Sequence, residues 1–127
     1  MEVLVKHGHG KLQQQIMVGK HTLISDVPEA AGGEDAGPEP HDLLAAALGS
    51  CTALTVTMYA RRKGWDLQDI EVQISQTQLG GTHMFTRQIR YVGNLSDDEK
   101  ARLTEIANKC PVHKTLSGTI QIVTEAN

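Results

Sequence analysis

The feature that most constrains this chain is a run of 18 uncharged residues from Leu43 to Ala60, LLAAALGSCTALTVTMYA. Pro40 suits the first turn of a helix, where its missing N–H costs nothing. Asp42 favours the positive N-terminal end of the helix dipole, and the three bases that follow the run favour the other end. The pattern therefore predicts one helix over about residues 40–63, which ends at Gly64.

The same run reaches the usual length for a membrane span but lacks the composition of one. Ten of its 18 residues are Ala, Gly, Ser or Thr, which gain little in lipid. We therefore predict no membrane partner and a soluble helix that is buried on most of its surface. A chain of 127 residues has little other material to surround such a helix. The need to bury this helix thus predicts a homodimer, in which a second copy of the chain covers the rest of the helix surface.

Short strands are predicted on both sides of this helix. An apolar period of two with Gly-containing turns predicts three strands before residue 26 and a long hairpin over about residues 70–91. The segment 26–39 is acidic and rich in Gly and Pro, which predicts an exposed loop.

The C-terminal third predicts two further helices and a strand. The segment Ser96–Glu99 is a capping box, so a helix is expected over about residues 97–108. Pro111 opens a short third helix, and the alternation around residues 120–124 predicts a closing strand. We interpret residues 1–127 as a single α+β domain.

Composition excludes several classes of protein. Fifteen acids against twelve bases give a net charge of -3 without a basic stripe, so nucleic acid is not an expected partner. The N-terminus lacks the pattern of a signal peptide, which leads us to expect a cytoplasmic protein. In a reducing compartment, Cys51 and Cys110 are expected as a redox pair, a metal pair or buried residues rather than as a structural disulfide.

The two cysteines have different local surroundings. Cys51 lies in the middle of the predicted long helix, where a space-filling role fits its neighbours as well as a chemical one. Cys110 precedes Pro111 at the start of the short helix, where N–H groups favour an anion, and two lysines and His113 add positive charge. Local chemistry alone therefore favours Cys110 as the thiol that more readily carries a negative charge.

Metal binding is a further alternative for the same residues. A set of Cys51, Cys110, His41 and His113 would in principle bind zinc. No Cys-x-x-Cys or His-x-x-x-His pair anchors such a set, so we expect no metal. No phosphate-binding loop is present either, and we expect no cofactor.

Two segments of the chain resemble the OsmC/Ohr family, the osmotically inducible and organic hydroperoxide resistance proteins. They are Gly37–Pro40 followed by DLLAAALGSCTALTVTMYARRKGW, and IANKCPVHKTL near the C-terminus. The resemblance extends from about residue 21 to the last predicted strand. It implies an OsmC-like fold in which antiparallel sheets surround long central helices in an intertwined homodimer.

The resemblance also implies a thiol-dependent peroxidase that reduces organic hydroperoxides, with hydrogen peroxide as a further substrate. Cys51 falls on the family's peroxidatic cysteine and Cys110 on its resolving cysteine. The cycle would form a Cys51 sulfenic acid and then a redox-active Cys51–Cys110 disulfide. A dithiol reductant, lipoyl-type or thioredoxin-type, would restore both thiols. Such an antioxidant activity belongs to an oxidative stress response.

The chain departs from the family at the groups that hold the thiolate. Better-characterised members use an Arg from the N-terminal strands and a Glu on the central helix, whereas here no Arg precedes Arg61 and the Glu position is His41. The candidates to replace them, with His41 as first choice, are His41, Asp42, Lys20, His21, Arg87 and His113. The missing pair motivates an alternative function, a non-catalytic OsmC-like dimer that binds a small ligand and has incidental thiols.

Overall fold

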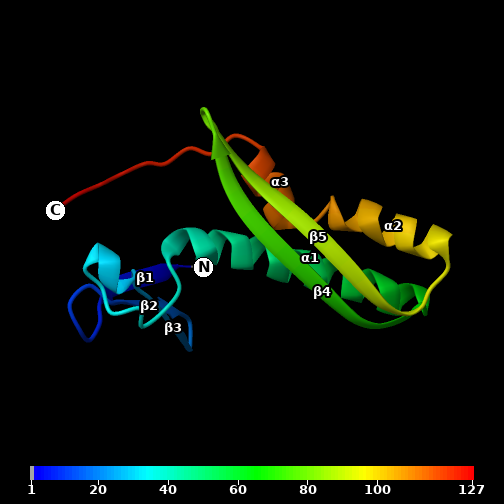
Figure 1. The fold of residues 1–127 in the computed structure, drawn as a ribbon, viewed down its shortest axis with the longest axis horizontal. Helices are drawn as coiled ribbons and strands as arrows, with labels where there is room; N and C mark the ends of the chain where they lie inside the picture. Colours follow the sequence, from blue (N-terminus) through cyan, green and yellow to red (C-terminus); the bar gives the residue numbers. More distant parts are fainter. Residues whose placement is uncertain (1) are drawn as a thin grey trace. The chain divides into compact units, whose positions relative to one another are not determined.

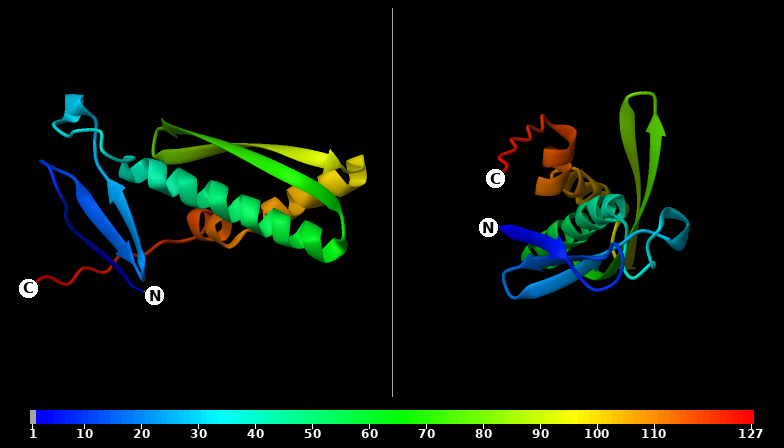
Figure 2. Two further views of the ribbon diagram at one scale, coloured as in Figure 1. Left: turned by 90° about the horizontal axis from the view of Figure 1, so that it is seen from below. Right: turned by 90° about the vertical axis from the view of Figure 1, so that its left-hand side faces the viewer.

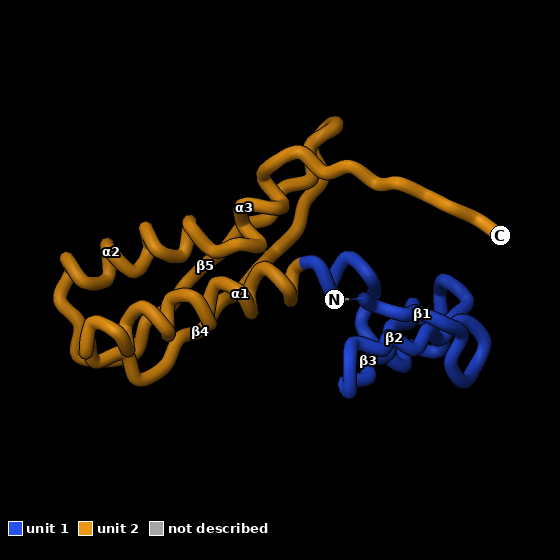
Figure 3. Tube along the Cα trace, turned by 180° about the vertical axis from the view of Figure 1, so that it is seen from behind, with its two compact units in different colours: residues 1–44 blue, residues 45–127 orange. Residues whose placement is uncertain are grey.

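The computed structural model describes residues 2–127 of the chain. It divides into two compact units, residues 1–44 and 45–127, which are coloured separately in Figure 3. Runs of consecutive strands are followed by helices in an α+β arrangement, as the sequence predicts (Figure 1). In chain order they are β1 (Val3–His7), β2 (Gln14–Val18), β3 (His21–Ser25), a 3-10 turn (Glu29–Ala31), α1 (Pro40–Lys63), β4 (Asp66–Leu79), β5 (Thr82–Asn94), α2 (Asp97–Ala107) and α3 (Pro111–Ser117).

The first unit contains the predicted three-stranded antiparallel meander. Its strand order is β1-β2-β3, with Val5 opposite Ile16 and Ile16 opposite Leu23. Gly19 has a φ of 58°, the left-handed conformation that lets β2 turn directly into β3. The apolar side chains of β1 are exposed, so this sheet leaves apolar surface uncovered within one chain.

The loop after β3 is organised around the carboxylate of Asp26, which is only 4% exposed. This carboxylate accepts hydrogen bonds from the backbone N–H groups of Val27, Glu34 and Ala36 at 2.8, 3.2 and 3.1 Å. The backbone bonds from Ala36 and Val27 hold the pKa of Asp26 below its ordinary value. The loop thus combines bonds to this side chain with backbone hydrogen bonds of its own, including Asp26 N to Pro38 O.

Helix α1 covers the residues predicted for it, and one chain buries only part of its surface. Its buried positions form one stripe of period four, Leu48, Thr52, Val56 and Ala60. Other apolar positions on it are exposed, with Leu54 and Met58 at 60% and 59%. One chain therefore buries a single stripe of α1, and burial of its other faces by a second copy stays a prediction.

Helix α1 is long and apolar enough, by length and composition, to cross a membrane. The core helix of a soluble protein passes the same test. The buried stripe of α1 packs on protein elements rather than presenting a uniform surface, and we interpret α1 as a core helix.

The second unit is built on the long β4–β5 hairpin, with α1 and α2 packed on one of its faces (Figure 2). Strand pairing places Ile70 opposite Tyr91 and Val72 opposite Ile89, so the inward positions alternate as a half-buried strand requires. The fully buried core joins α1 to α2 through Val56, Ala60, Leu103 and Ala107. The hairpin extends further at both ends than the sequence predicts.

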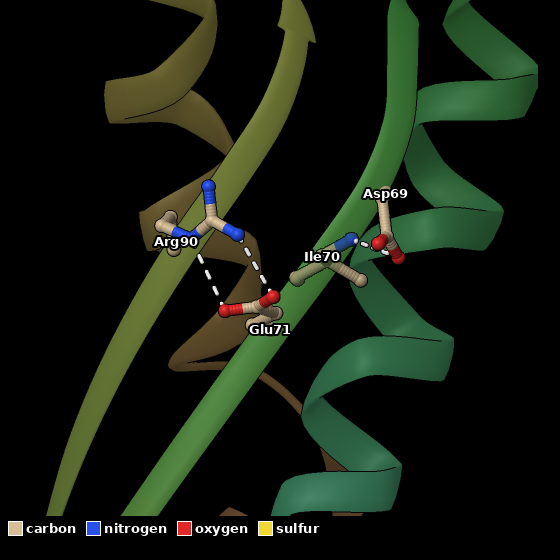
Figure 4. A network of polar contacts seen from close by, with 4 residues as sticks. All are labelled: Asp69, Ile70, Glu71 and Arg90. Atoms are coloured by element: carbon tan, nitrogen blue, oxygen red, sulfur yellow. Dashed lines mark hydrogen bonds and ion pairs between the residues drawn. The ribbon is translucent and has the colours of Figure 1, made fainter.

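The outer face of the hairpin is polar. Arg90 donates to both carboxylate oxygens of Glu71, at 3.1 and 2.8 Å, as Figure 4 shows. The two side chains are 65% and 61% exposed, so this ion pair adds little to stability. The pair identifies Arg90 as an outward-facing residue of β5.

Helix α2 begins at the predicted capping box, in which Ser96 and Glu99 exchange side-chain to backbone hydrogen bonds. Helix α3 follows directly with Cys110 as its N-cap and Pro111 at its first position. The predicted closing strand is wrong: residues 119–127 form no strand, and Ile120 and Ile122 are exposed. An alternating sequence favours an extended chain, but a strand also needs a neighbour for its backbone N–H and C=O groups.

Candidate functional site

The two cysteines lie on α1 and at the start of α3, and both are free thiols. Cys51 is partly exposed, and its Sγ lies 3.9 Å from Oγ1 of Thr55, one turn further along α1. Cys110 is fully buried, and its Sγ accepts a hydrogen bond from the backbone N–H of His113 at 3.3 Å. The more accessible thiol is therefore Cys51.

Thr52 connects the surroundings of the two cysteines. It follows Cys51 on α1, and its Oγ1 lies 3.9 Å from Sγ of Cys110. The Thr52 hydroxyl donates its one hydrogen to the carbonyl oxygen of Leu48 at 2.7 Å. The Thr52 oxygen is therefore the acceptor in its other contacts, and the Cys110 S–H is the donor toward it.

Arg87 enters the same site from β5. It occupies an inward position of the strand, opposite Ile74. Its Nη1 donates to Thr52 Oγ1 at 3.0 Å and its Nη2 donates to Asn108 Oδ1 at 2.8 Å. Nη2 also lies 3.1 Å from Nδ1 of His113. One guanidinium thus joins α1, the end of α2 and α3 beside Cys110.

The contact with Arg87 fixes the tautomer of His113. A guanidinium has only donors, so Nδ1 of His113 must accept, and the ring hydrogen lies on Nε2. A protonated His113 would instead place two donors face to face. In this arrangement the positive charge beside Cys110 comes from Arg87.

A cavity of about 250 Å³ adjoins this network inside the second unit. Its walls come from α1, β5 and α3, and the residues that line it are Leu48, His83, Phe85, Arg87, His113, Leu116 and Ser117. Neither cysteine lines it, and no Asp or Glu does. The cavity and the thiols therefore share Arg87 and His113 as neighbours.

The six residues predicted as thiolate stabilisers divide between the two units. The structure brings together Arg87 and His113 with Cys110 and Thr52. The other four belong to residues 1–44 and keep their roles as predictions. Asp42 accepts from the backbone N–H of Glu39 at 3.3 Å, and His41 is exposed in the first turn of α1. Lys20 forms the turn before β3, and His21 begins that strand.

Sequence reasoning missed two polar members of the site, Thr52 and Asn108. The sequence offers one signal for Thr52, which directly follows Cys51 on the helix. The other buried positions of the same period-four stripe are apolar, so a polar residue there is unusual. Asn108 directly follows α2 and is exposed, so nothing local marks it as a partner of Arg87. Within residues 2–127, no three His, Cys, Asp or Glu side chains gather as metal ligands.

A family model described as OsmC-like protein matches residues 32–125, which is most of the chain. The chain belongs to the OsmC-like protein family. The match includes both cysteines, Arg87 and His113. For this OsmC-like protein, a search of curated proteins found no match.

Solved structures share the fold of this OsmC-like protein. An OsmC-like protein from Mycoplasma pneumoniae has a TM-score of 0.77 at 16% identity, over 92% of this chain and 86% of that chain. An organic hydroperoxide resistance protein OsmC from Legionella pneumophila has a TM-score of 0.66 at 21% identity, over 93% and 90%. An organic hydroperoxide resistance protein from Bacillus subtilis has a TM-score of 0.59 at 24% identity, over 92% and 90%. At these identities the likeness establishes the fold.

Proposed function

We propose that this OsmC-like protein is a two-cysteine hydroperoxide reductase whose preferred substrates are organic hydroperoxides. The observation that carries the proposal is the contact of the Cys110 thiol with Thr52, the residue after Cys51, beside the cation of Arg87. Membership of the family supports it, as does the presence of hydroperoxide resistance proteins among the structures with this fold. Residues 1–127 would act as one domain.

The chemical cycle follows from the two thiols. The Cys51 thiolate attacks one oxygen of the O–O bond, the alkoxide leaves and takes up a proton as an alcohol, and Cys51 becomes a sulfenic acid. The Cys110 sulfur then attacks the Cys51 sulfur, which releases water and forms a disulfide. A dithiol of the lipoyl or thioredoxin type reduces this disulfide and is itself oxidised to a disulfide. Each turnover moves two electrons from the dithiol to the hydroperoxide.

We assign the attack to Cys51 because it is the more accessible of the two thiols. Buried Cys110 is suited to the second step, which needs no outside reactant. The bridge requires the two Cα atoms to come within about 4.4–6.8 Å. Arg87 is our first candidate to stabilise the thiolate, since its Nη1 bonds Thr52 next to Cys51 while its Nη2 meets His113 beside Cys110. This replaces the sequence-based preference for His41.

A homodimer is part of the proposal. The exposed apolar residues of α1, Leu54 and Met58, and those of the C-terminal segment, Ile120 and Ile122, form surface that one chain leaves uncovered. Burial of such surface between two copies is favourable in proportion to its apolar area. We place the protein in the cytoplasm, where a dithiol pool keeps both thiols reduced.

The test is steady-state reduction of cumene hydroperoxide with dihydrolipoamide or reduced thioredoxin. Cys51→Ser should abolish turnover, whereas Cys110→Ser should allow one turnover and then accumulate a Cys51 sulfenic acid that dimedone traps. Ser50→Ala, an exposed neighbour on the same helix, is the matched control and should retain wild-type activity. Turnover that survives in Cys51→Ser would refute the proposal.

A further inference from the structure

The cavity of about 250 Å³ in the second unit is lined by both apolar and polar side chains. Leu48, Phe85 and Leu116 give it an apolar wall. Its polar lining includes Arg87 and His113, which contact each other at 3.1 Å, and Ser117. His83 also lines it, with its ring against Phe85 and its Nε2 2.8 Å from Oε1 of Gln76. A space lined by apolar side chains together with a guanidinium and an imidazole suits an amphipathic occupant rather than water alone.

Arg87 brings a charge to this cavity that no carboxylate of the described residues balances. The arginine ion pairs that the structure shows are Arg90–Glu71 and Arg102–Glu105, and neither includes Arg87. The three contacts of Arg87 are with a hydroxyl, an amide and a neutral imidazole. A guanidinium in a part-buried site normally has an anionic partner, because its desolvation is otherwise uncompensated.

The guanidinium of Arg87 also has N–H groups that its three contacts do not use. Its contacts use one Nη1–H and both Nη2–H groups, which leaves the Nε–H and the second Nη1–H. His113 adds its Nε2–H, because its Nδ1 faces Arg87 as an acceptor. Two residues of the cavity wall thus offer N–H donors around one positive charge, which is the chemistry that recognises a carboxylate.

We propose that this cavity binds a small monocarboxylate with a short unbranched apolar tail. The carboxylate meets Arg87 and the Nε2–H of His113, and the tail lies against Leu48, Phe85 and Leu116. A cavity of about 150 Å³ holds benzene, and pockets for drug-sized ligands begin at about 300 Å³. The 250 Å³ here therefore fits a chain of about six carbons. Binding needs neither thiol, so it stands independently of the peroxidase proposal.

The first experiment is titration calorimetry of the reduced wild-type protein with three six-carbon probes, hexanoate, 1-hexanol and hexylamine. Hexanoate should bind roughly tenfold or more tightly than hexanol, since it adds a charge-assisted hydrogen bond, and hexylamine should not bind. From butyrate to hexanoate the affinity should rise roughly fourfold for each added methylene. Equal affinity for hexanoate and hexanol, or no binding of hexanoate at millimolar concentration, would overturn the proposal.

A pair of arginine variants on the same strand locates the site. Arg87→Gln should weaken hexanoate binding roughly tenfold or more. Arg90→Gln is the matched control, because Arg90 faces outward with Glu71, and it should bind hexanoate as the wild type does. Unchanged hexanoate binding in a folded Arg87→Gln protein would contradict the assignment of the site. If that variant fails to fold, the comparison of hexanoate, hexanol and hexylamine on the wild type tests the proposal by itself. Cys51→Ser should bind hexanoate normally, which separates this site from the thiol chemistry.

Discussion

Asp26 shows how one residue organises a whole loop. Its carboxylate accepts three backbone N–H groups from a segment that has no sheet to pair with. Such charge-assisted bonds are stronger than neutral ones and satisfy three backbone donors of the loop. These bonds act together with backbone hydrogen bonds of the loop, such as those from Asp26 N to Pro38 O and from Asp35 N to Val27 O.

We expect Asp26→Asn to loosen this loop in a pH-dependent way. The pKa of folded Asp26 is below its ordinary value, mainly through the backbone bond from Ala36, so its stabilisation is present above a pH of about 4. It is lost as the pH falls through the folded pKa. Amide exchange at Glu34 and Ala36 should therefore be faster in the variant at pH 7, with the difference vanishing in acid.

The matched control is Glu29→Gln, which removes an exposed carboxylate from the same loop. It should leave the exchange of Glu34 and Ala36 unchanged. An equal acceleration in both variants would show that net charge, rather than the Asp26 bonds, orders the segment.

Residue-level chemistry was predictable where its cause is local. The Ser96 and Glu99 capping box is read directly from four adjacent residues and is present in the structure. The bond between Arg87 and Thr52 joins residues 35 positions apart and depends on which face of β5 meets which stripe of α1. No local sequence pattern predicts this contact between β5 and α1. Arg87 was therefore one of six candidates to stabilise the thiolate and was not preferred among them.

At the scale of elements, the base of the β4–β5 hairpin depends on a glycine. Gly93 has a φ of 149° and lies opposite Leu67, where the strand register shifts between Leu67 and Asp69. A Cβ at Gly93 would collide with the carbonyl oxygen of Asp66. This oxygen belongs to the backbone, so it cannot move aside by a change of rotamer as a side-chain atom can.

Gly93→Ala should therefore destabilise the protein by about 1–3 kcal/mol through strain and displacement of the strand. Urea unfolding followed by circular dichroism measures the change. Gly81→Ala near the hairpin turn is the control, because a Cβ there meets nothing within 4 Å. Its cost should stay below about 0.5 kcal/mol, and equal losses for the two variants would contradict this account.

Helix α1 shows what sequence patterns establish about an element and what they leave open. Pro40, Asp42 and Gly64 give its boundaries, because capping and dipole effects act over one turn. The burial of α1 was harder to predict. An apolar sequence does not show whether the helix surface is covered by the same chain or by another chain. The failed prediction of a strand at residues 120–124 has the same cause.

At the scale of the whole molecule, the uncovered apolar surface leads us to expect a dimer. Sedimentation velocity at micromolar concentration should show a dimer for the wild type. Leu54→Glu should give a monomer, because it would bury an unpaired charge at a cost of several kcal/mol. Lys100→Glu, an exposed change on α2, should remain dimeric. A monomeric wild type would contradict the expectation.

The central claim is that Cys51 and Cys110 form one redox unit. The measurement that tests it most directly is a thiol titration before and after one equivalent of cumene hydroperoxide, with the products mapped by mass spectrometry. We predict rapid loss of both thiols and a Cys51–Cys110 disulfide, with neither change in Cys51→Ser. Two thiols that persist without a bridge would contradict the claim and favour a ligand-binding OsmC-like dimer with incidental thiols.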